Sequence, residues 1–210
     1  MTFTIENLKE SDVEAVVKLF HIIIDELHEK SLEVERLHFK DMYPAEEVTN
    51  RLSNKDCIYL VARENDKVAG FMFAWVSEGV GNIHWMGIAP EHRKKGYGDK
   101  LIEETIKIFF FFFCYEAKLF TYFFEKAAYH LFQKHGFREA AFIDRRFFGT
   151  NIIFMVRKIT PVPEEHRSKK IVLAGEAEVV VGTVDCDVFL TVVLECLHEL
   201  LEVVLAAHFT

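Results

Sequence analysis

Hydrophobic residues recur with two different spacings along residues 1–158. Alternation with a period of two, between short polar turns, predicts six strands, over residues 3–8, 57–62, 68–76, 82–88, 117–124 and 147–158. Spacings of three and four predict four helices, over residues 13–27, 45–52, 97–108 and 127–134. The order of these elements predicts an α/β (α+β) domain in which a mixed sheet carries helices on its faces.

The composition changes after residue 158. Pro161, Pro163 and the charged run over residues 164–170 mark a linker, which we place at residues 159–170. Residues 159–210 carry nine acidic and three basic residues, a net charge of −6, so the preceding residues hold only −2 of the chain's total of −8. The sequence thus predicts a domain over residues 1–158 and an acidic accessory tail over residues 171–210.

The tail contains a mostly apolar segment at residues 188–208, which Asp185 or Asp187 can cap as a helix. Its internal glutamates argue against a membrane span, because each acid near the bilayer centre costs about 2.5–3.5 kcal/mol. The domain has an apolar run of its own, the five phenylalanines of residues 109–113, which is an aggregation hazard unless it is covered. We expect the tail helix to pack near this run on the domain, or on a second copy in a homo-oligomer.

The composition excludes several classes of protein. With 50% hydrophobic and 28% charged residues, the chain is typical of folded globular proteins. The negative net charge argues against nucleic-acid binding, because the phosphate backbone needs a broad basic surface. Four cysteines without a CxxC pair, in a chain that shows no secretory segment, predict reduced thiols and a cytoplasmic protein. Ten histidines lack the spacing of metal ligands, so no metal is predicted.

One short stretch, EHRKKGYGDK at residues 91–100, concentrates positive charge beside two glycines in this acidic chain. Gly96 and Gly98 allow backbone conformations that other residues resist, at the point where a helix is expected to begin. The unpaired N–H groups of a helix start form an anion-binding nest, which suits the oxygens of a pyrophosphate. An ordinary glycine turn with solvated cations is the alternative that this stretch alone leaves open.

Two motifs resemble the GNAT superfamily of N-acetyltransferases. Residues 88–98, IAPEHRKKGYG, end a predicted strand and open a helix, and they resemble the acetyl-coenzyme A signature R/QxxGxG/A. One strand later, the chain resembles the NxxAxxLYxKxGF helix of the family at Ala128, Leu131, Phe132, Lys134, Gly136 and Phe137. The resemblance covers about residues 1–158 and implies a mostly antiparallel central sheet and an acyltransferase that uses acetyl-coenzyme A as cosubstrate.

The resemblance also implies which residues bind acetyl-coenzyme A. The main-chain N–H groups of the loop would hold the pyrophosphate, at Arg93, Lys94, Lys95, Gly96, Tyr97 and Gly98. The pantetheine arm would pair with the backbone of Gly87, Ile88 and Ala89, where Gly87 is expected to let the strand splay or bulge away from residues 117–124. The later helix would contribute Glu125, Ala128 and Phe132. Glu125 departs from the asparagine of the family, and a carboxylate cannot donate to a pantetheine amide.

Catalysis in such a site is direct attack of an amine on the thioester carbonyl, with the Ile88 N–H as the expected carbonyl donor. We favour His84 as general base, because alternation along a strand places it on the face of Met86 and Ile88. A histidine that only packs or hydrogen-bonds is the alternative. Glu78 and Glu125 are weaker candidates that act through water.

The acid that protonates the leaving thiolate is less certain from the motif. Phe132 replaces the family's frequent tyrosine, so that Tyr129, Tyr122 or water substitutes, or coenzyme A leaves as the thiolate. Tyr129 is our preferred candidate among the tyrosines.

The acceptor implied by the family is a primary amine of a small molecule or peptide, unidentified from sequence. Several acids near the N-terminus would suit a cationic acceptor, although a solvated helix face is the favoured explanation for them: Asp25, Glu26, Glu29, Glu33 and Glu35. The departures at Glu125 and Phe132 keep open an acyl-coenzyme A sensor or scaffold that performs little or no transfer. A tail-mediated structural protein with a relic domain is the third alternative.

Overall fold

The computed structural model describes residues 3–27 and 30–159. The chain divides into two compact units, Met1–Pro161 and Val162–Thr210, and all described residues belong to the first. The linker and tail helix expected beyond Ile159 therefore lie outside the described residues, as does Glu29. Among the described residues, no helix combines the length and apolar content that crossing a membrane requires.

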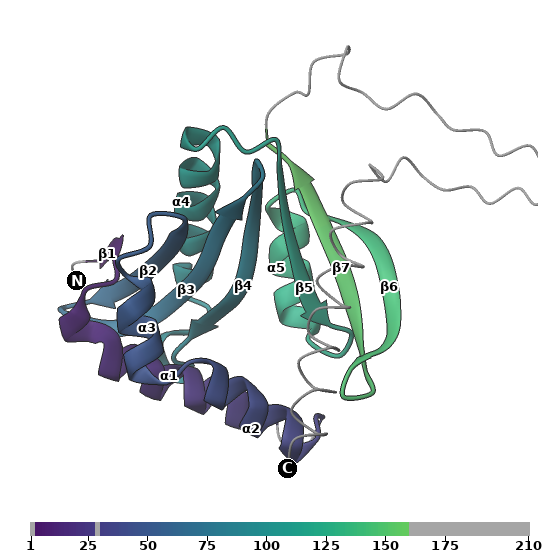
Figure 1. Cartoon of the computed structure of the whole chain (residues 1–210), viewed down its shortest axis with the longest axis horizontal. Coiled ribbons are helices and arrows are strands. Elements are labelled where there is room, and N and C mark those ends of the chain that lie inside the picture. The colour runs from purple at the N-terminus through teal and green to yellow at the C-terminus, as the bar shows by residue number, and fades with distance from the viewer. Residues whose placement is uncertain (1–2, 28–29, 160–210) are drawn as a thin grey trace, which may run out of the picture. The chain divides into compact units, whose positions relative to one another are not determined.

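The described part contains one seven-stranded sheet and five α-helices (Figure 1). The strands are β1 Phe3–Asn7, β2 Cys57–Glu64, β3 Lys67–Ser77, β4 Val80–Ile88, β5 Glu116–Tyr122, β6 Arg138–Phe147 and β7 Thr150–Lys158. The helices are α1 Val13–Asp25, α2 Glu33–Met42, α3 Ala45–Arg51, α4 Tyr97–Phe111 and α5 Lys126–Lys134. The sheet order is β1-β2-β3-β4-β5-β7-β6, and only β4 and β5 pair in parallel. The predicted mixed, mostly antiparallel α/β fold is thus confirmed.

The hydrophobic pattern does not predict two of the elements, α2 and β6. Helix α2 exposes Val34 and Leu37 while burying Phe39 and Glu35, so its sequence shows no continuous apolar stripe. Strand β6 is an edge strand interrupted by two register shifts, and its charged residues break the alternation that marks a strand. The single closing strand predicted at residues 147–158 is therefore wrong at its start, because Phe147 ends β6 and β7 begins after a tight turn.

The sheet separates two hydrophobic clusters. Successive residues of a strand point to opposite faces, and β3 follows this rule. Met72 joins the cluster under α4 and α5, whereas Phe71 and Phe73 join the cluster under α1, α2 and α3. All three side chains are fully buried, and full burial of such a side chain contributes roughly 1.5–3 kcal/mol. The two faces of the sheet are therefore covered by different helices.

Strands β4 and β5 diverge part of the way along their length (Figure 1). They pair from Val80↔Glu116 to Ile83↔Leu119, but β4 continues to Ile88 and β5 to Tyr122. The remaining residues face each other across an opening in the sheet. Because α4 begins just after β4 and α5 just after β5, both helices start beside this opening.

A β-bulge lies in β4 at the point of divergence. Phe73 pairs with Trp85 and Ala74 with Ile83, so His84 is the extra residue. Gly87 was expected to let the strand splay or bulge: β4 is separated from β5 at Gly87, but the bulge itself lies at His84. Gly87 has a packing role instead, because a Cβ there would lie 2.6 Å from Phe71 Cε1.

Candidate active site

The loop before α4 presents a continuous run of main-chain donors. In the part of the chain that the structure describes, the N–H groups of residues 94–99 donate to no protein acceptor. The run begins one residue later than the motif suggests, because the Arg93 N–H donates to Pro90 O at 3.3 Å, and it ends where Lys100 N–H donates to Gly96 O at 3.2 Å. Gly96 allows this geometry with φ of 87°, at the N-cap of α4. The amides and the positive end of the helix dipole form an anion-binding nest.

The cations beside the nest mostly hold the loop in place. Arg93 pairs with Glu26 and donates through Nε to Ile88 O at 3.1 Å. Lys95 Nζ lies 3.3 Å from Glu64 Oε2. Lys94 has no carboxylate partner among residues 3–27 and 30–159, and its side chain is exposed. Lys94 therefore supplies the uncompensated charge at the nest.

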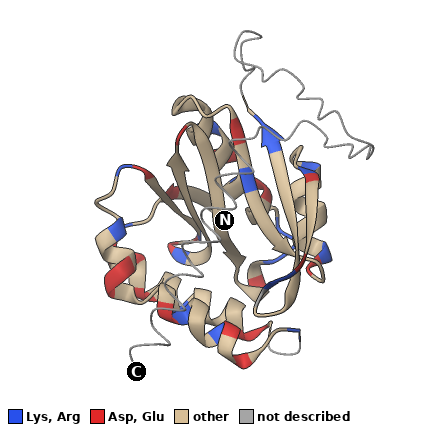
Figure 2. Cartoon of the chain, turned by 45° about the vertical axis from the view of Figure 1, so that its right-hand side comes forward, with Lys and Arg blue, Asp and Glu red and all other residues tan. Residues whose placement is uncertain are grey.

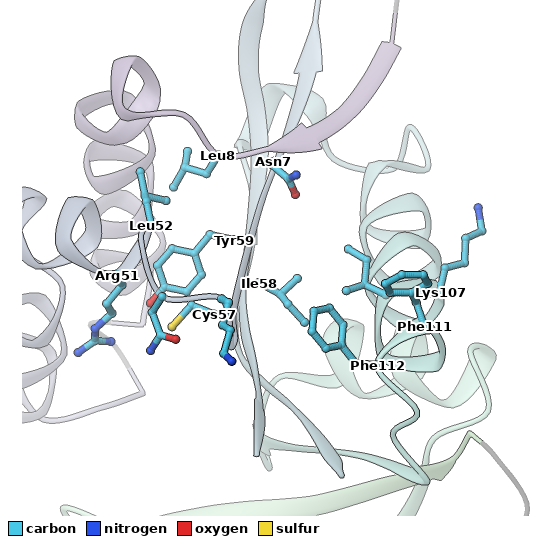
Figure 3. A pocket seen from close by; sticks show the side chains of 13 residues that line it. Asn7, Leu8, Arg51, Leu52, Cys57, Ile58, Tyr59, Lys107, Phe111 and Phe112 are labelled. Atoms are coloured by element: carbon cyan, nitrogen blue, oxygen red, sulfur yellow. The ribbon is translucent and has the colours of Figure 1, made fainter. Parts of the chain in front are cut away.

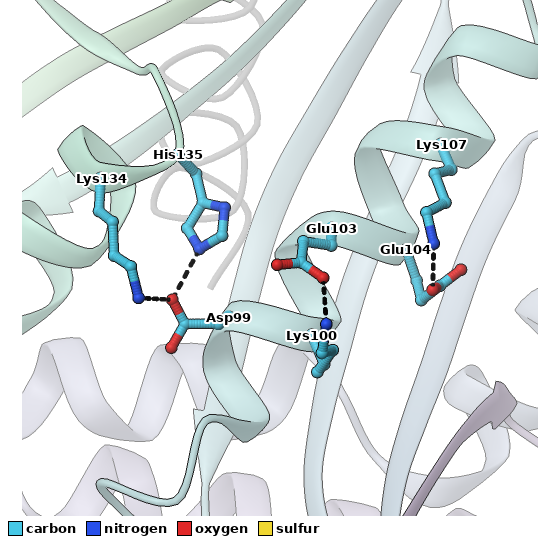
Figure 4. A network of polar contacts seen from close by, with 7 residues as sticks. All are labelled: Asp99, Lys100, Glu103, Glu104, Lys107, Lys134 and His135. Atoms are coloured by element: carbon cyan, nitrogen blue, oxygen red, sulfur yellow. Dashed lines mark hydrogen bonds and ion pairs between the residues drawn. The ribbon is translucent and has the colours of Figure 1, made fainter.

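A polar network joins the first turn of α4 to the last turn of α5 (Figure 4). Asp99 Oδ1 accepts hydrogen bonds from Lys134 Nζ at 2.5 Å and from His135 Nε2 at 2.9 Å. The hydrogen bond from Lys134 is the largest cause that lowers the pKa of Asp99. The network fixes α5 beside the nest, and Lys134 compensates a carboxylate that would otherwise oppose a bound anion.

A cavity of about 160 Å³ occupies the opening between β4 and β5. Part of its wall belongs to the cluster under α4 and α5: Ile83, Met86, Leu119, Ala128 and Phe132. The rest belongs to the cluster under α1, α2 and α3: Ile23, Leu27, Phe39, Trp85 and Tyr122. Since its walls come from both faces, the cavity runs through the sheet. Two reactants can therefore meet there from opposite sides.

One main-chain donor of β4 faces the opening. Ala89 N–H donates to Ala69 O, at the β3 side, at 2.9 Å. Successive residues of an antiparallel strand direct their polar backbone groups to opposite edges, so Ile88 N–H points toward the gap left by β5. The Ile88 carbonyl also points away from β3, because it accepts a hydrogen bond from Arg93. Of the three residues expected to pair with a pantetheine arm, Ile88 is thus the one whose N–H faces the gap, while its carbonyl already accepts from Arg93.

His84 lines the cavity but points to a different face from the one expected. The bulge breaks the alternation, and His84 Nδ1 hydrogen-bonds the hydroxyl of Tyr43 in the cluster under α1, α2 and α3. Its expected face, with Met86 and Ile88, is therefore wrong. The His84 ring also packs edge-on against Trp75, with ring centroids 5.2 Å apart.

Burial and a nearby cation keep His84 neutral. Burial and, to a smaller extent, the Arg51 cation lower the pKa of His84 to about 4. Burial also raises the pKa of Tyr43, so its phenol keeps its proton and can donate to Nδ1. His84 is neutral near pH 7, and its ring proton lies on Nε2 in the tautomer that accepts from Tyr43.

The other predicted site residues divide into two groups. Glu125, Ala128 and Phe132 line the cavity, and Glu125 Oε1 also pairs with Lys30 Nζ at 3.2 Å. Glu78 lies in the β3–β4 turn, six residues before His84, and it is not among the residues that line the cavity. Tyr129 does not line the cavity, because its hydroxyl donates to Glu139 at 3.2 Å and accepts from Gln133 at 3.0 Å.

A buried carboxylate that sequence reasoning assigned to the surface holds α2 against the sheet. Glu35 is fully buried and accepts hydrogen bonds from Tyr122 Oη at 2.7 Å and from Thr150 Oγ1 at 3.2 Å. Burial raises the pKa of Tyr122, and the bond to Glu35 raises it further. No local pattern reveals this pair, since Glu35 and Tyr122 are 87 positions apart.

Most of the acids expected to attract a cation are already partnered. Asp25 Oδ1 lies 2.6 Å from Lys40 Nζ, Glu26 pairs with Arg93, and Glu35 is buried. Figure 2 shows acidic and basic positions interspersed along the helices below the sheet. Among the described residues of this region, Asp25, Glu26 and Glu35 therefore do not form an extended acidic surface.

A larger cavity, of about 510 Å³, lies at another end of the sheet (Figure 3). It is bounded by the start of β2 at Cys57, Ile58 and Tyr59 and by the end of α4 at Phe111 and Phe112. It shares no lining residue with the cavity in the opening, so we do not assign it to the active site. Within residues 3–27 and 30–159, no group of three or more His, Cys, Asp or Glu side chains is arranged to hold a metal ion.

Known proteins resemble the chain in sequence pattern and in fold. Residues 21–137, more than half of the chain, match the Acetyltransferase (GNAT) family. PaiA N-acetyltransferase from Thermoplasma acidophilum, solved in complex with coenzyme A, is 19% identical with a TM-score of 0.65, over 75% of this chain and 99% of that one. A GNAT-family acetyltransferase from Streptococcus pneumoniae is 23% identical with a TM-score of 0.63, over 76% of this chain and 100% of that one.

The ribosomal-protein-S18-alanine N-acetyltransferase from Escherichia coli is 18% identical with a TM-score of 0.60, over 78% of this chain and 97% of that one. A search of curated proteins gave no match. The solved structures establish likeness of fold, and the family match covers the nest, the opening and α5. The chain therefore belongs to the GNAT family of acetyltransferases.

Proposed function

We propose that this acetyltransferase transfers the acetyl group of acetyl-coenzyme A to a primary amine of a small molecule or peptide. One observation carries the proposal: six consecutive free amides at the start of α4 lie next to an opening through the sheet. A glycine turn that binds no ligand would not need to lie beside such an opening. A pyrophosphate at the nest and a thioester in the opening account for both features.

The residues that would hold acetyl-coenzyme A fit its chemistry. The amides of residues 94–99 and the charge of Lys94 suit a pyrophosphate. The free edge of β4 at Ile88 suits the amides of a pantetheine arm, and Ala128 and Phe132 supply an apolar wall. Glu125, paired with Lys30, supplies no donor, so recognition of the arm rests on the β4 backbone.

The reaction needs a positioned carbonyl and a neutral amine. The amine nitrogen attacks the thioester carbonyl carbon, a C–N bond forms, the C–S bond breaks and the amine loses one proton. The Ile88 N–H stabilises the developing oxyanion, a contact whose removal costs about 3 kcal/mol in related chemistry. The departing sulfur accepts the proton or leaves as thiolate, because a free thiol has a pKa near 8.5.

His84 enters this scheme as a hydrogen-bond donor. In the tautomer whose Nδ1 accepts from Tyr43, the other ring nitrogen carries the proton and has no lone pair to accept one. We therefore assign Nε2–H to orient a reacting group, in place of the general base expected from sequence. Glu78 has no direct part, because it lies in the β3–β4 turn, and Tyr129 has none, because its hydroxyl is bonded to Glu139 and Gln133.

Calorimetry with acetyl-coenzyme A, combined with thiol release over a panel of amines, tests the proposal. We expect saturable binding, and release of coenzyme A in equal amount to the acetylated amine measured by mass spectrometry. Binding without turnover on any amine would favour the sensor, for which Phe132 and the Glu125–Lys30 ion pair are the supporting observations. Absence of binding would refute both functions.

A further inference from the structure

The acceptor side of the cavity indicates which amine the enzyme uses. We propose that the acceptor is a small primary amine with an apolar, aromatic-sized body, and not a polycation such as a polyamine or aminoglycoside. This inference rests on the acetyltransferase function proposed above. It follows from the lining, the charges and the size of the cavity.

The lining of the acceptor side is aromatic and aliphatic. Phe39 and Trp85 pack edge to face, with ring centroids 5.0 Å apart, and Trp85 is backed by Phe20 at 5.3 Å. Tyr122 closes the wall from β5, with its hydroxyl turned to Glu35. These packed rings present apolar surface, and aromatic pairs gain about 0.5–1.5 kcal/mol beyond area burial. An aromatic or bulky aliphatic group is the complementary ligand.

Among the residues that the structure describes, no unpaired carboxylate lines the cavity to bind a second positive charge. Glu125 is the one acid among the described lining residues, and it pairs with Lys30. Glu35, behind Tyr122, accepts hydrogen bonds from Tyr122 and Thr150. An extra ammonium group in the cavity would lose its water without gaining a counter-ion, which is unfavourable. A polyamine would bring at least one such group.

The same apolar lining favours the reactive form of the amine. Burial in a low-dielectric site disfavours the charged ammonium and lowers its pKa. The neutral amine is the nucleophile, so an apolar cavity raises the fraction of amine that is neutral without a nearby base. This agrees with a His84 ring whose Nδ1 is already bonded to Tyr43.

The size of the cavity limits the acceptor further. Its volume of about 160 Å³ includes the space for the thioester. Sites for drug-sized ligands usually measure about 300–1,000 Å³. A single ring on a short amine fits this limit, whereas an aminoglycoside does not.

The test compares 2-phenylethylamine with spermidine and kanamycin as acceptors for the full chain. We expect kcat/KM for 2-phenylethylamine to exceed that for either polycation by about tenfold or more, which corresponds to about 1.4 kcal/mol. In Phe39→Leu, kcat/KM for 2-phenylethylamine should fall several-fold while the KM for acetyl-coenzyme A is unchanged. Val48→Ala shortens a buried side chain of the same cluster that does not line the cavity, so it should reduce stability without changing the acceptor preference.

The outcomes separate this inference from the proposed function. Faster turnover of spermidine or kanamycin overturns the inference and leaves the acetyltransferase standing. Binding of 2-phenylethylamine can be followed by the fluorescence of the two tryptophans. Binding that is lost in Trp85→Phe, without turnover, supports the inference and refutes the proposed acetyltransferase function. If 2-phenylethylamine neither reacts nor binds, the inference is wrong.

Discussion

At the scale of single residues, Gly96 gives the sharpest test of the nest. Its φ of 87° suits glycine, and no atom lies within 4 Å of a Cβ placed there. Gly96→Ala therefore costs about 1–2 kcal/mol of backbone strain without a clash. We expect the loop to relax, the amides to lose alignment and the Kd for acetyl-coenzyme A to rise roughly tenfold, as measured by calorimetry.

Gly149 in the β6–β7 turn is the matched control. It has φ of 85° and equally open space around a Cβ. Gly149→Ala should lose a similar free energy of unfolding and keep the affinity for acetyl-coenzyme A. Equal loss of affinity in the two variants would show that the effect of Gly96→Ala is general destabilisation.

His84 predicts a dependence of stability on pH. Its pKa is about 4 in the folded protein and ordinarily 6.5, so the unfolded chain binds the proton first as the pH falls. The free energy of unfolding should then decrease between about pH 6.5 and pH 4, by about 3 kcal/mol at most from this group, and level off below. Urea unfolding across this range measures it.

Comparison with His84→Gln isolates the contribution, because other groups titrate in the same range. The variant has no proton to bind at this position, so the difference in unfolding free energy between it and the wild type should change across the window. Parallel curves would mean that the ring is protonated as readily in the folded protein as in the unfolded one.

Local chemistry explains which site residues are predictable. The nest follows from Gly96 and the cations around it, which are adjacent in sequence. The orientation of His84 does not, because the bulge reverses the alternation and its partner Tyr43 is 41 positions away. The role of Glu35 is hidden for the same reason.

At the scale of elements, the phenylalanine run ends α4 in an unusual way. Cys114 N–H donates to Phe109 O and Phe113 N–H to Phe110 O, which is a Schellman motif. Buried Phe109 and Cys114 make its hydrophobic contact. Phe113 occupies the left-handed position with φ of 57° and is 85% exposed. The run is therefore part core and part helix cap.

This cap predicts opposite effects of glycine at two neighbouring positions. Phe113→Gly should raise the free energy of unfolding by about 1 kcal/mol, because glycine favours the left-handed conformation. Phe111→Gly, in the last turn of the helix, should lower it by up to about 1 kcal/mol, because glycine is a poor helix former. Thermal unfolding of the two variants checks the signs, and a destabilised Phe113→Gly would mean that the ring makes contacts in solution that outweigh the strain.

Elements with a continuous apolar face are predictable, and those held by specific contacts are not. Helix α4 buries Leu101, Ile102 and Phe109 on one side, so its periodicity is visible in the sequence. Helix α2 depends on Phe39 and on the Glu35 hydrogen bonds, which leave no repeating pattern. The interrupted strand β6 is recognised only by its pairing with β7.

At the scale of the whole molecule, the site belongs entirely to the unit Met1–Pro161. The sheet, both hydrophobic clusters, the nest and the cavity are all formed by described residues of that unit. We therefore expect the truncated chain, ending at Pro161, to unfold in one cooperative transition and to bind acetyl-coenzyme A within about twofold of the full chain. Calorimetry and chemical denaturation measure both, and a truncated chain that folds but does not bind would place a needed residue in the removed segment.

The same truncation tests the role proposed for the tail. It removes nine acidic and three basic residues, so the net charge changes from −8 to −2. A smaller net charge and the exposed rings of Phe111 and Phe113, 78% and 85% exposed, both favour self-association. If the tail covers these rings, sedimentation should show larger species for the truncated chain. Introducing Phe111→Ser and Phe113→Ser together into the truncated chain should restore the smaller species. Association that persists in the double variant would assign it to the charge, and an unchanged size after truncation would refute the covering role.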